Sequence, residues 1–226
     1  MKRIVLLAVV ILVGLATFAQ TGKEYEKQAQ DAYKAKNYPK AFLDYTRAVE
    51  TYEAEGVTDT ALYYNVTITG YKARKYEELI PYAEKAIELG HDKAHLAYYI
   101  KAIAYDKLGK DEKYLETLKS GHRAFPSYGR ISKKLAVAYL KQGMEPYKAG
   151  AQIVQNAEPL RESEPEKYKA EIEKANEKFE EARKIFEKAY EANPKEEQVL
   201  KSLAAVYQSL EMEEKAEKIN SELQSL

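Results

Sequence analysis

One pattern recurs five times along this chain and constrains its fold more than any other feature. The copies are segments of 15 residues that begin at Lys36, Arg74, Gly109, Glu177 and Glu211. Their sixth residues are separated by 38, 35, 68 and 34 positions, and 68 is twice 34. A period of this length is typical of stacked helical hairpins, because a single hairpin cannot bury its apolar face alone. The pattern therefore predicts an all-α solenoid and favours recognition over catalysis.

A second predicted helix precedes each copy, so that one unit consists of helix A, a tight turn and helix B. Small residues recur at fixed positions, which lets two helices approach to about 8–10 Å. They are Ala29, Thr67, Ala102, Ala136 and Ala204 in helix A, and Ala41, Ala182, Ala216, Ala48, Ala86 and Ala189 in helix B. Leu79, Tyr114 and Gly121 depart from this small-residue pattern.

Aromatic residues and prolines complete the repeat. The aromatic positions are Tyr105, Tyr139 and Tyr207 in helix A, and Tyr38, Tyr76 and Phe179 at the start of helix B. Pro126 and Pro194 close two units, because proline cannot continue a helix. With these residues the chain after Lys23 resembles the tetratricopeptide-repeat family. The resemblance implies a right-handed superhelix of antiparallel helix pairs, whose A helices line a concave surface that binds peptides or folded proteins.

We expect about five hairpins, of which the fourth is elongated. The predicted units are 22–55, 58–90, 92–125, 128–194 and a capping unit, 195–226. Residues 144–176 leave two alternatives, an elongated hairpin or a degenerate extra repeat. Unbroken seams of apolar or small residues, from Ala136 to Ala157 and from Tyr168 to Ala189, favour the hairpin. Its tip would project by roughly 25 Å, and Ser163 and Glu166 are spaced as a capping box at the turn.

The balance of charges argues against some classes of partner. The chain has 36 basic and 36 acidic residues, and the two signs are interleaved along its helices. Such interleaving is typical of a solvated helix surface, so we expect neither nucleic acid nor an anionic membrane as a partner. The absence of cysteine excludes a disulfide framework.

The first residues differ from the rest of the chain. Met1, Lys2 and Arg3 form a positive segment, Ile4 to Phe18 are apolar, and Ala19 ends a small-residue cleavage pattern. This combination predicts a secretory signal, residues 1–19, that is cut after Ala19. An uncleaved membrane anchor is the alternative, but the apolar run of 15 residues is shorter than the ~20 needed to span a bilayer. We expect a periplasmic or secreted protein without stable membrane insertion after cleavage.

The sequence shows no pattern typical of a catalytic, cofactor or metal site. Nucleotide-binding glycine loops and nucleophile or metalloprotease motifs do not occur. His91 and His95 are four residues apart, a spacing that can place two imidazoles on one face of a helix. However, His91 directly follows Gly90, where the preceding helix is expected to end. We interpret both as ordinary surface histidines, and His122 has no evident partner nearby in the sequence. The protein is therefore not expected to be an enzyme.

The resemblance assigns specific positions of helix A to the concave groove. Those that we expect to contact a protein or peptide partner are Tyr33, Tyr64, Ile68, Tyr71, Leu96, Tyr99, Ile103, Arg130, Lys133 and Val137. Tyrosine suits such a surface because it buries a large area and keeps a hydroxyl group for hydrogen bonding. The same tyrosines could instead fill the space between helices.

Two interpretations of function follow. The first is an exported scaffold or adaptor that binds a partner through the tyrosine-rich groove. The alternative is a structural or assembly component that acts through the projecting fourth hairpin or by self-association. The sequence leaves homo-oligomerisation open.

Overall fold

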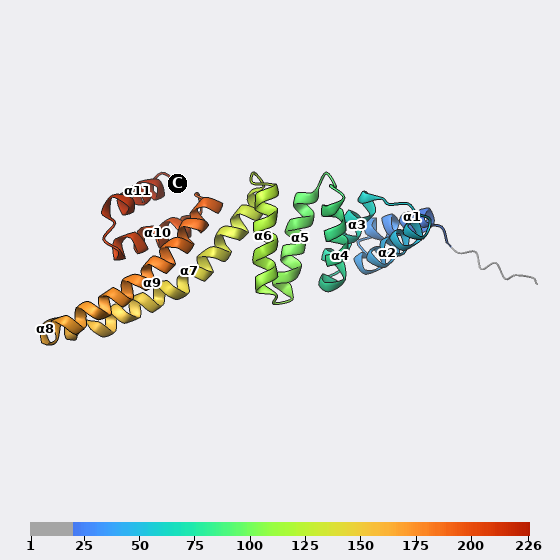
Figure 1. Ribbon diagram of the computed structural model, residues 1–226. Coiled ribbons are helices and arrows are strands. Elements are labelled where there is room, and N and C mark those ends of the chain that lie inside the picture. Colours follow the sequence, from blue (N-terminus) through green and yellow to red (C-terminus); the bar gives the residue numbers. More distant parts are fainter. Residues whose placement is uncertain (1–19) are drawn as a thin grey trace, which may run out of the picture.

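A computed structural model describes residues 20–226, and these residues form eleven helices with no strand among them. The predicted signal, 1–19, lies outside the described residues. The first three hairpins are α1 (Gly22–Lys34) with α2 (Tyr38–Ala54), α3 (Thr60–Lys72) with α4 (Tyr76–Glu88), and α5 (Ala94–Lys107) with α6 (Asp111–Ala124). Figure 1 shows them as a row in which each helix follows its neighbour. Each packs against the next, and α3 also contacts α5 directly.

The tight turns between helices A and B use one backbone conformation. Lys36, Arg74, Gly109 and Glu211, the first residues of four of the five copies, have φ between 55° and 66°. This left-handed conformation is readily adopted by glycine and is unfavourable for other residues. The remaining copy begins at Glu177, which lies inside a long helix and needs no turn. The repeated turn gives the hairpins their common geometry.

The fourth hairpin is elongated, as the apolar seams predict. It consists of α7 (Gly129–Ala157), the short α8 (Leu160–Ser163) and α9 (Pro165–Ala192), and α7 continues through Pro146 as one helix. Helices α7 and α9 pack against each other and extend away from the row (Figure 1). Two glycines of α7 lie against aromatic rings of α9: a Cβ atom on Gly143 would be 2.5 Å from Phe186, and one on Gly150 would be 2.8 Å from Phe179. Glycine at these points lets the two helices approach closely.

The predicted capping box at this turn is wrong. Ser163 lies in α8, and its hydroxyl donates to the carbonyl oxygen of Pro159. Helix α9 begins with Pro165, and its N-cap residue, Glu164, makes no side-chain capping bond. Proline at the first helical position already has a helical φ, and its missing N–H group is one that would have no partner inside the helix.

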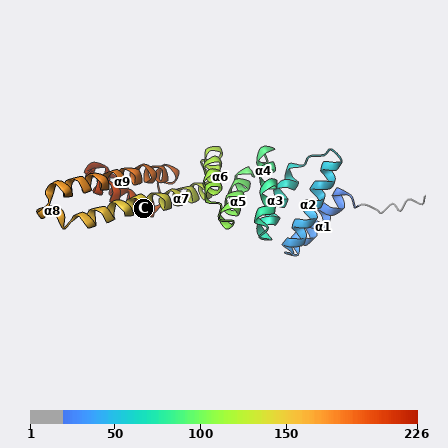
Figure 2. The same cartoon turned by 60° about the horizontal axis from the view of Figure 1, so that its bottom comes forward.

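The last hairpin, α10 (Glu197–Ser209) with α11 (Glu213–Gln224), packs against the base of the arm. Figure 2 shows it alongside α9, while the tip of the arm at α8 extends beyond it. The Tyr207 hydroxyl donates to Glu187 at 2.9 Å, and the Tyr190 hydroxyl donates to Glu222 at 2.7 Å. These bonds connect the arm to both helices of the capping unit. The α-solenoid with an elongated fourth hairpin is thus confirmed.

Alkaline pH is expected to destabilise this fold. Burial raises the pKa of Tyr63, Tyr114 and Tyr207 from 10.0 to about 12, with nearby carboxylates adding to the effect. Each phenol stays protonated in the folded chain at a pH where it ionises in the unfolded chain. The stabilisation is therefore complete below pH 10 and is lost as the pH rises towards 12. The midpoint of urea unfolding should fall over this range, and less steeply in Tyr207→Phe. A constant midpoint would contradict the prediction.

Candidate protein-binding surface on the A helices

The ten predicted contact residues lie on α1, α3, α5 and α7, and we call the surface that they form the A-helix face. Tyr33, Tyr71 and Val137 are 36%, 37% and 43% exposed. Among the others, Arg130 and Lys133 are exposed, while Tyr64, Ile68, Leu96 and Tyr99 are half-buried. Ile103 is buried, so it supports this surface from beneath and offers little contact area itself. The face thus presents tyrosine and aliphatic side chains together with two cations.

Lys72 connects the first unit to the second. Its ammonium group lies 4.8 Å from the ring centre of Tyr38 and 5.5 Å from that of Tyr33. The two rings meet edge to face, with their centres 5.6 Å apart. A cation over an aromatic face is attracted to the ring's negative charge density, so Lys72 holds both tyrosines in place. Tyr33 is therefore fixed in orientation although it is exposed.

Tyr64 connects the second unit to the third. Its ring stacks on the His91 imidazole with centres 4.4 Å apart and planes 13° from parallel, and the Lys93 ammonium lies 5.6 Å from the same ring centre. Burial raises the pKa of the Tyr64 hydroxyl, and the nearby Asp92 carboxylate raises it further. The phenol therefore remains a neutral hydrogen-bond donor at physiological pH.

Tyr128, just before α7, connects the third unit to the fourth. Its ring lies 4.7 Å from His95 and 6.4 Å from Tyr99, both in edge-to-face orientation. The Arg130 guanidinium lies 6.0 Å from the Tyr99 ring centre. The Tyr128 hydroxyl is buried without a hydrogen-bond partner, the one such side-chain atom among residues 20–226. Aromatic contacts therefore cross all three joints between these four units.

The A-helix face ends in a cleft of about 380 Å³ where α7 diverges from α5 and α6. Val137 and Tyr114 contribute apolar surface to it, and the remaining lining is Asp106, Asp111, Leu115, Lys134, Ala138, Lys141, Gln142 and Glu145. Charges of both signs surround the apolar part. The cleft has the size of a pocket for one or two side chains of a partner.

The interpretation of the histidines as ordinary surface residues is wrong. The His91 side chain is 10% exposed and stacks on Tyr64. His95 is half-buried beside Tyr128 and Phe125. His122 does have a partner, because its Nδ1 atom lies 3.1 Å from the Ser132 hydroxyl oxygen. All three contact a neighbouring unit, and sequence spacing within one helix does not reveal such contacts.

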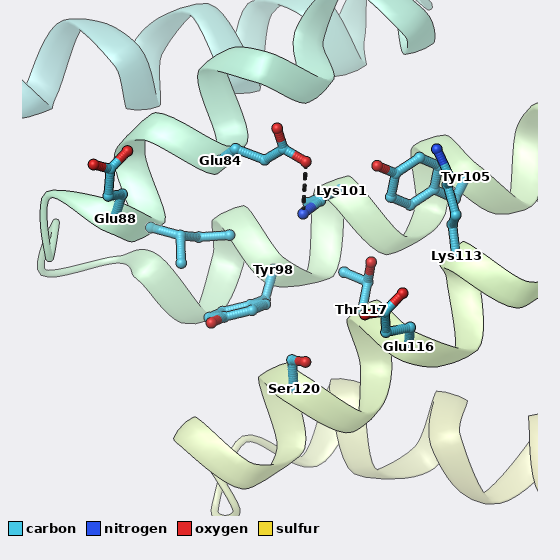
Figure 3. Close-up of a pocket in the computed structure, with 10 residues that line it drawn as sticks. Glu84, Glu88, Tyr98, Lys101, Tyr105, Lys113, Glu116, Thr117 and Ser120 are labelled. Carbon is cyan, nitrogen blue, oxygen red and sulfur yellow. Dashed lines mark ion pairs between the residues drawn. The ribbon is translucent and has the colours of Figure 1, made fainter.

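The opposite side of the solenoid carries a cleft of about 390 Å³ between α4 and α6, with α5 as its floor (Figure 3). Lys101 forms an ion pair with Glu84 across it, at 2.9 Å. Figure 3 shows Lys113, Glu116, Thr117 and Ser120 on the facing wall. The charges of both signs in this cleft offset one another, so it has no marked preference for an ion of either sign.

Residues 20–226 contain neither a candidate metal site nor a candidate membrane span. No group of three or more side chains there has a geometry suited to a metal ion. None of the helices in this range has both the length and the apolar composition of a membrane span.

Comparison with solved structures gives the same architecture. A crystal structure of a TPR-repeat protein from Bacteroides fragilis superimposes with a TM-score of 0.60, covering 83% of this chain and 98% of that protein at 24% identity. This chain has the tetratricopeptide-repeat fold. A crystal structure of the MamA protein has the same fold, with a TM-score of 0.52 and 13% identity over 90% of each chain. No protein-family model matches the sequence, and no curated protein matches it significantly.

Proposed function

We propose that this protein is an exported, non-enzymatic scaffold that binds a protein or peptide partner through the A-helix face. The observation that carries the proposal is the set of aromatic contacts across the joints between units. These contacts hold Tyr33, Tyr64 and Tyr99 of the A-helix face, and Tyr33 is still 36% exposed. A surface that is ordered before binding loses less side-chain entropy when a partner docks.

The chemistry of the face indicates the kind of partner. Tyr33, Tyr71 and Val137 offer apolar contact area, while phenol hydroxyls and the Arg130 guanidinium offer hydrogen-bond donors. Such a mixture suits a polypeptide, whose backbone carbonyl groups accept hydrogen bonds and whose side chains fill apolar sites. The cleft beside Val137 would receive an apolar side chain of the partner.

The projecting arm supports the alternative function less well. Its apolar side chains are used where α7 meets α9, and none of the large hydrophobic residues that are exposed in residues 20–226 belongs to 138–192. Self-association through the arm would therefore depend on polar contacts. Deleting 150–169 and measuring mass by light scattering tests the alternative, which requires that an oligomer lose subunits.

The direct test is the double substitution Tyr71→Ala and Tyr99→Ala in the mature chain that begins at Gln20. If the two side chains anchor the partner, the binding free energy should weaken by roughly 2 kcal/mol or more. The measurement is quantitative capture by the tagged protein of a partner that was first identified with the unaltered chain. Phenylalanine at both positions should restore most of the affinity, because the ring area remains.

A matched control separates binding from folding. Tyr52→Ala with Tyr168→Ala removes two half-buried tyrosines outside the A-helix face and should leave capture unchanged. Circular dichroism verifies that each variant keeps its helices. Undiminished capture by the folded Tyr71/Tyr99 variant would exclude the A-helix face as the binding site.

A further inference from the structure

A third cleft, of about 360 Å³, lies between α6 and α9 with α7 as its floor. We call it the basic cleft. Its lining residues are Lys119, His122, Arg123, Leu135, Tyr139, Lys188, Glu191 and Ala192. It is formed where the regular row of units meets the base of the elongated hairpin, and it takes no part in the A-helix face. Any ligand here would be bound independently of the function proposed above.

Three of the eight residues that line the basic cleft are cations, and none of the three has an acidic partner within ion-pair distance among residues 20–226. Most lysines and arginines of the solenoid that form ion pairs do so with a carboxylate three or four residues away on the same helix, as Lys201 does with Glu197. Lys119, Arg123 and Lys188 form no ion pair within 4.0 Å in the described part of the chain. With three cations and Glu191 as the one carboxylate, the lining carries a formal charge of +3 − 1 = +2, with His122 counted as neutral.

The spacing of these cations is unfavourable for the fold itself. Lys119 and Arg123 are four residues apart on α6, and like charges at this spacing repel each other and destabilise a helix slightly. Across the cleft, Lys188 of α9 adds a third positive charge. The neighbouring cleft in Figure 3 shows the opposite arrangement, since there Lys101 is paired with Glu84. An anionic ligand would relieve the repulsion that the protein leaves uncompensated.

The floor of the cleft determines what else the ligand must contain. Leu135 and Ala192 are buried apolar residues at its base, and the Lys119 ammonium lies 5.6 Å from the centre of the Tyr139 ring. Burial raises the pKa of the Tyr139 hydroxyl, and the Glu191 carboxylate raises it further, so the phenol is a neutral donor. The cleft thus combines cations at its rim with an apolar base and one hydroxyl group.

We propose that the basic cleft binds an acidic segment of a protein partner, with carboxylates at Lys119, Arg123 and Lys188 and one apolar side chain on the floor. The volume suits one or two side chains. Nucleic acid fits less well, because its binding needs basic residues along an extended stripe, and the helices beyond the cleft carry interleaved charges. Charge complementarity and the apolar floor together favour a polypeptide.

The test measures fluorescence anisotropy of a labelled synthetic peptide in which glutamates flank a central phenylalanine. The charge reversal Lys119→Glu, Arg123→Glu and Lys188→Glu should raise the dissociation constant about tenfold or more at moderate salt, because attraction becomes repulsion. A control with the same net charge, Lys27→Glu, Lys169→Glu and Lys218→Glu, alters exposed lysines elsewhere and should change it less than about twofold. Replacing glutamate by glutamine in the peptide should abolish binding.

Several outcomes would overturn the proposal. Equal losses in the two triple variants would show that only net charge matters, and no loss in either would exclude the cleft. A single-stranded oligonucleotide that displaces the peptide at a lower concentration than the unlabelled peptide does would identify a nucleic-acid site instead. The variant Lys119→Gln with Lys188→Gln introduces no repulsion into the fold. It should still weaken binding severalfold, and unchanged affinity would count against the proposal.

Discussion

Replacing Phe186 by alanine is expected to lower the free energy of unfolding by about 3–5 kcal/mol. The Phe186 side chain is fully buried, its ring centre lies 6.2 Å from that of Tyr147, and it packs directly over Gly143. Because Gly143 has no side chain, no neighbouring group can fill the space that the ring leaves. The loss therefore combines the transfer free energy of the ring with the energy of the remaining cavity.

The destabilisation should be confined to one part of the molecule. In a solenoid each unit contacts only its neighbours, so α7, α9 and the capping hairpin should exchange amide hydrogens faster while α1–α4 keep their protection. Urea unfolding gives the total loss, and hydrogen exchange followed by mass spectrometry gives its location. Phe125→Ala, which removes a half-buried ring, serves as a control and should cost less. Uniformly faster exchange along the whole chain would contradict this account.

Replacing Leu79 by alanine is expected to lower the free energy of unfolding by about 2–5 kcal/mol, although alanine is the usual residue at this repeat position. Leu79 is fully buried, and it lies against Gly70, where an added Cβ atom would be 2.8 Å from the Leu79 Cβ. Gly70 occupies the position, three residues after the small residue of helix A, that holds Tyr207 in the last unit, where the residue equivalent to Leu79 is Ala216. In the second unit the large residue of this contact is therefore on helix B and the small residue is on helix A.

A double-mutant cycle tests this arrangement. Gly70→Ala alone should be destabilising by about 1–3 kcal/mol, because its methyl group would overlap Leu79 and the Phe42 ring. Alanine at position 79 keeps the Cβ atom that causes this overlap, so the cycle uses Leu79→Gly, in which Gly70→Ala should be less destabilising because only the overlap with the Phe42 ring remains. The two single losses should therefore exceed the double loss by about 1 kcal/mol or more. Additive losses would show that the two residues do not compensate each other.

The same pair shows how far the repeat pattern can be interpreted. The 34-residue period was sufficient to predict the helix pairs and the elongated hairpin, because small residues and unbroken seams directly reflect how helices approach. Leu79 departs from the small-residue pattern, and the glycine that leaves room for its side chain, Gly70, is on the other helix of the unit. A departure at one position is interpretable only when the contacting position is known.

The candidate binding surface was likewise predictable from the sequence only in part. Its ten residues follow from their positions in helix A, and nine of them are exposed or half-buried, while Ile103 is buried. The sequence did not indicate that His91, His95 and Tyr128 connect the units, because each contacts a residue of a different hairpin. Nor did it indicate the basic cleft, because Lys188 of α9 is 65 residues or more from the cations of α6 in the chain.

The sequence alone was enough to predict the helical units and to favour extra length in the fourth, because burial of apolar side chains depends on a period that is visible in one dimension. The tertiary structure decided which charges remain unpaired, which rings meet at the joints and where clefts open. Those properties depend on the distances between helices that are remote in the chain, and only the stacked arrangement sets these distances.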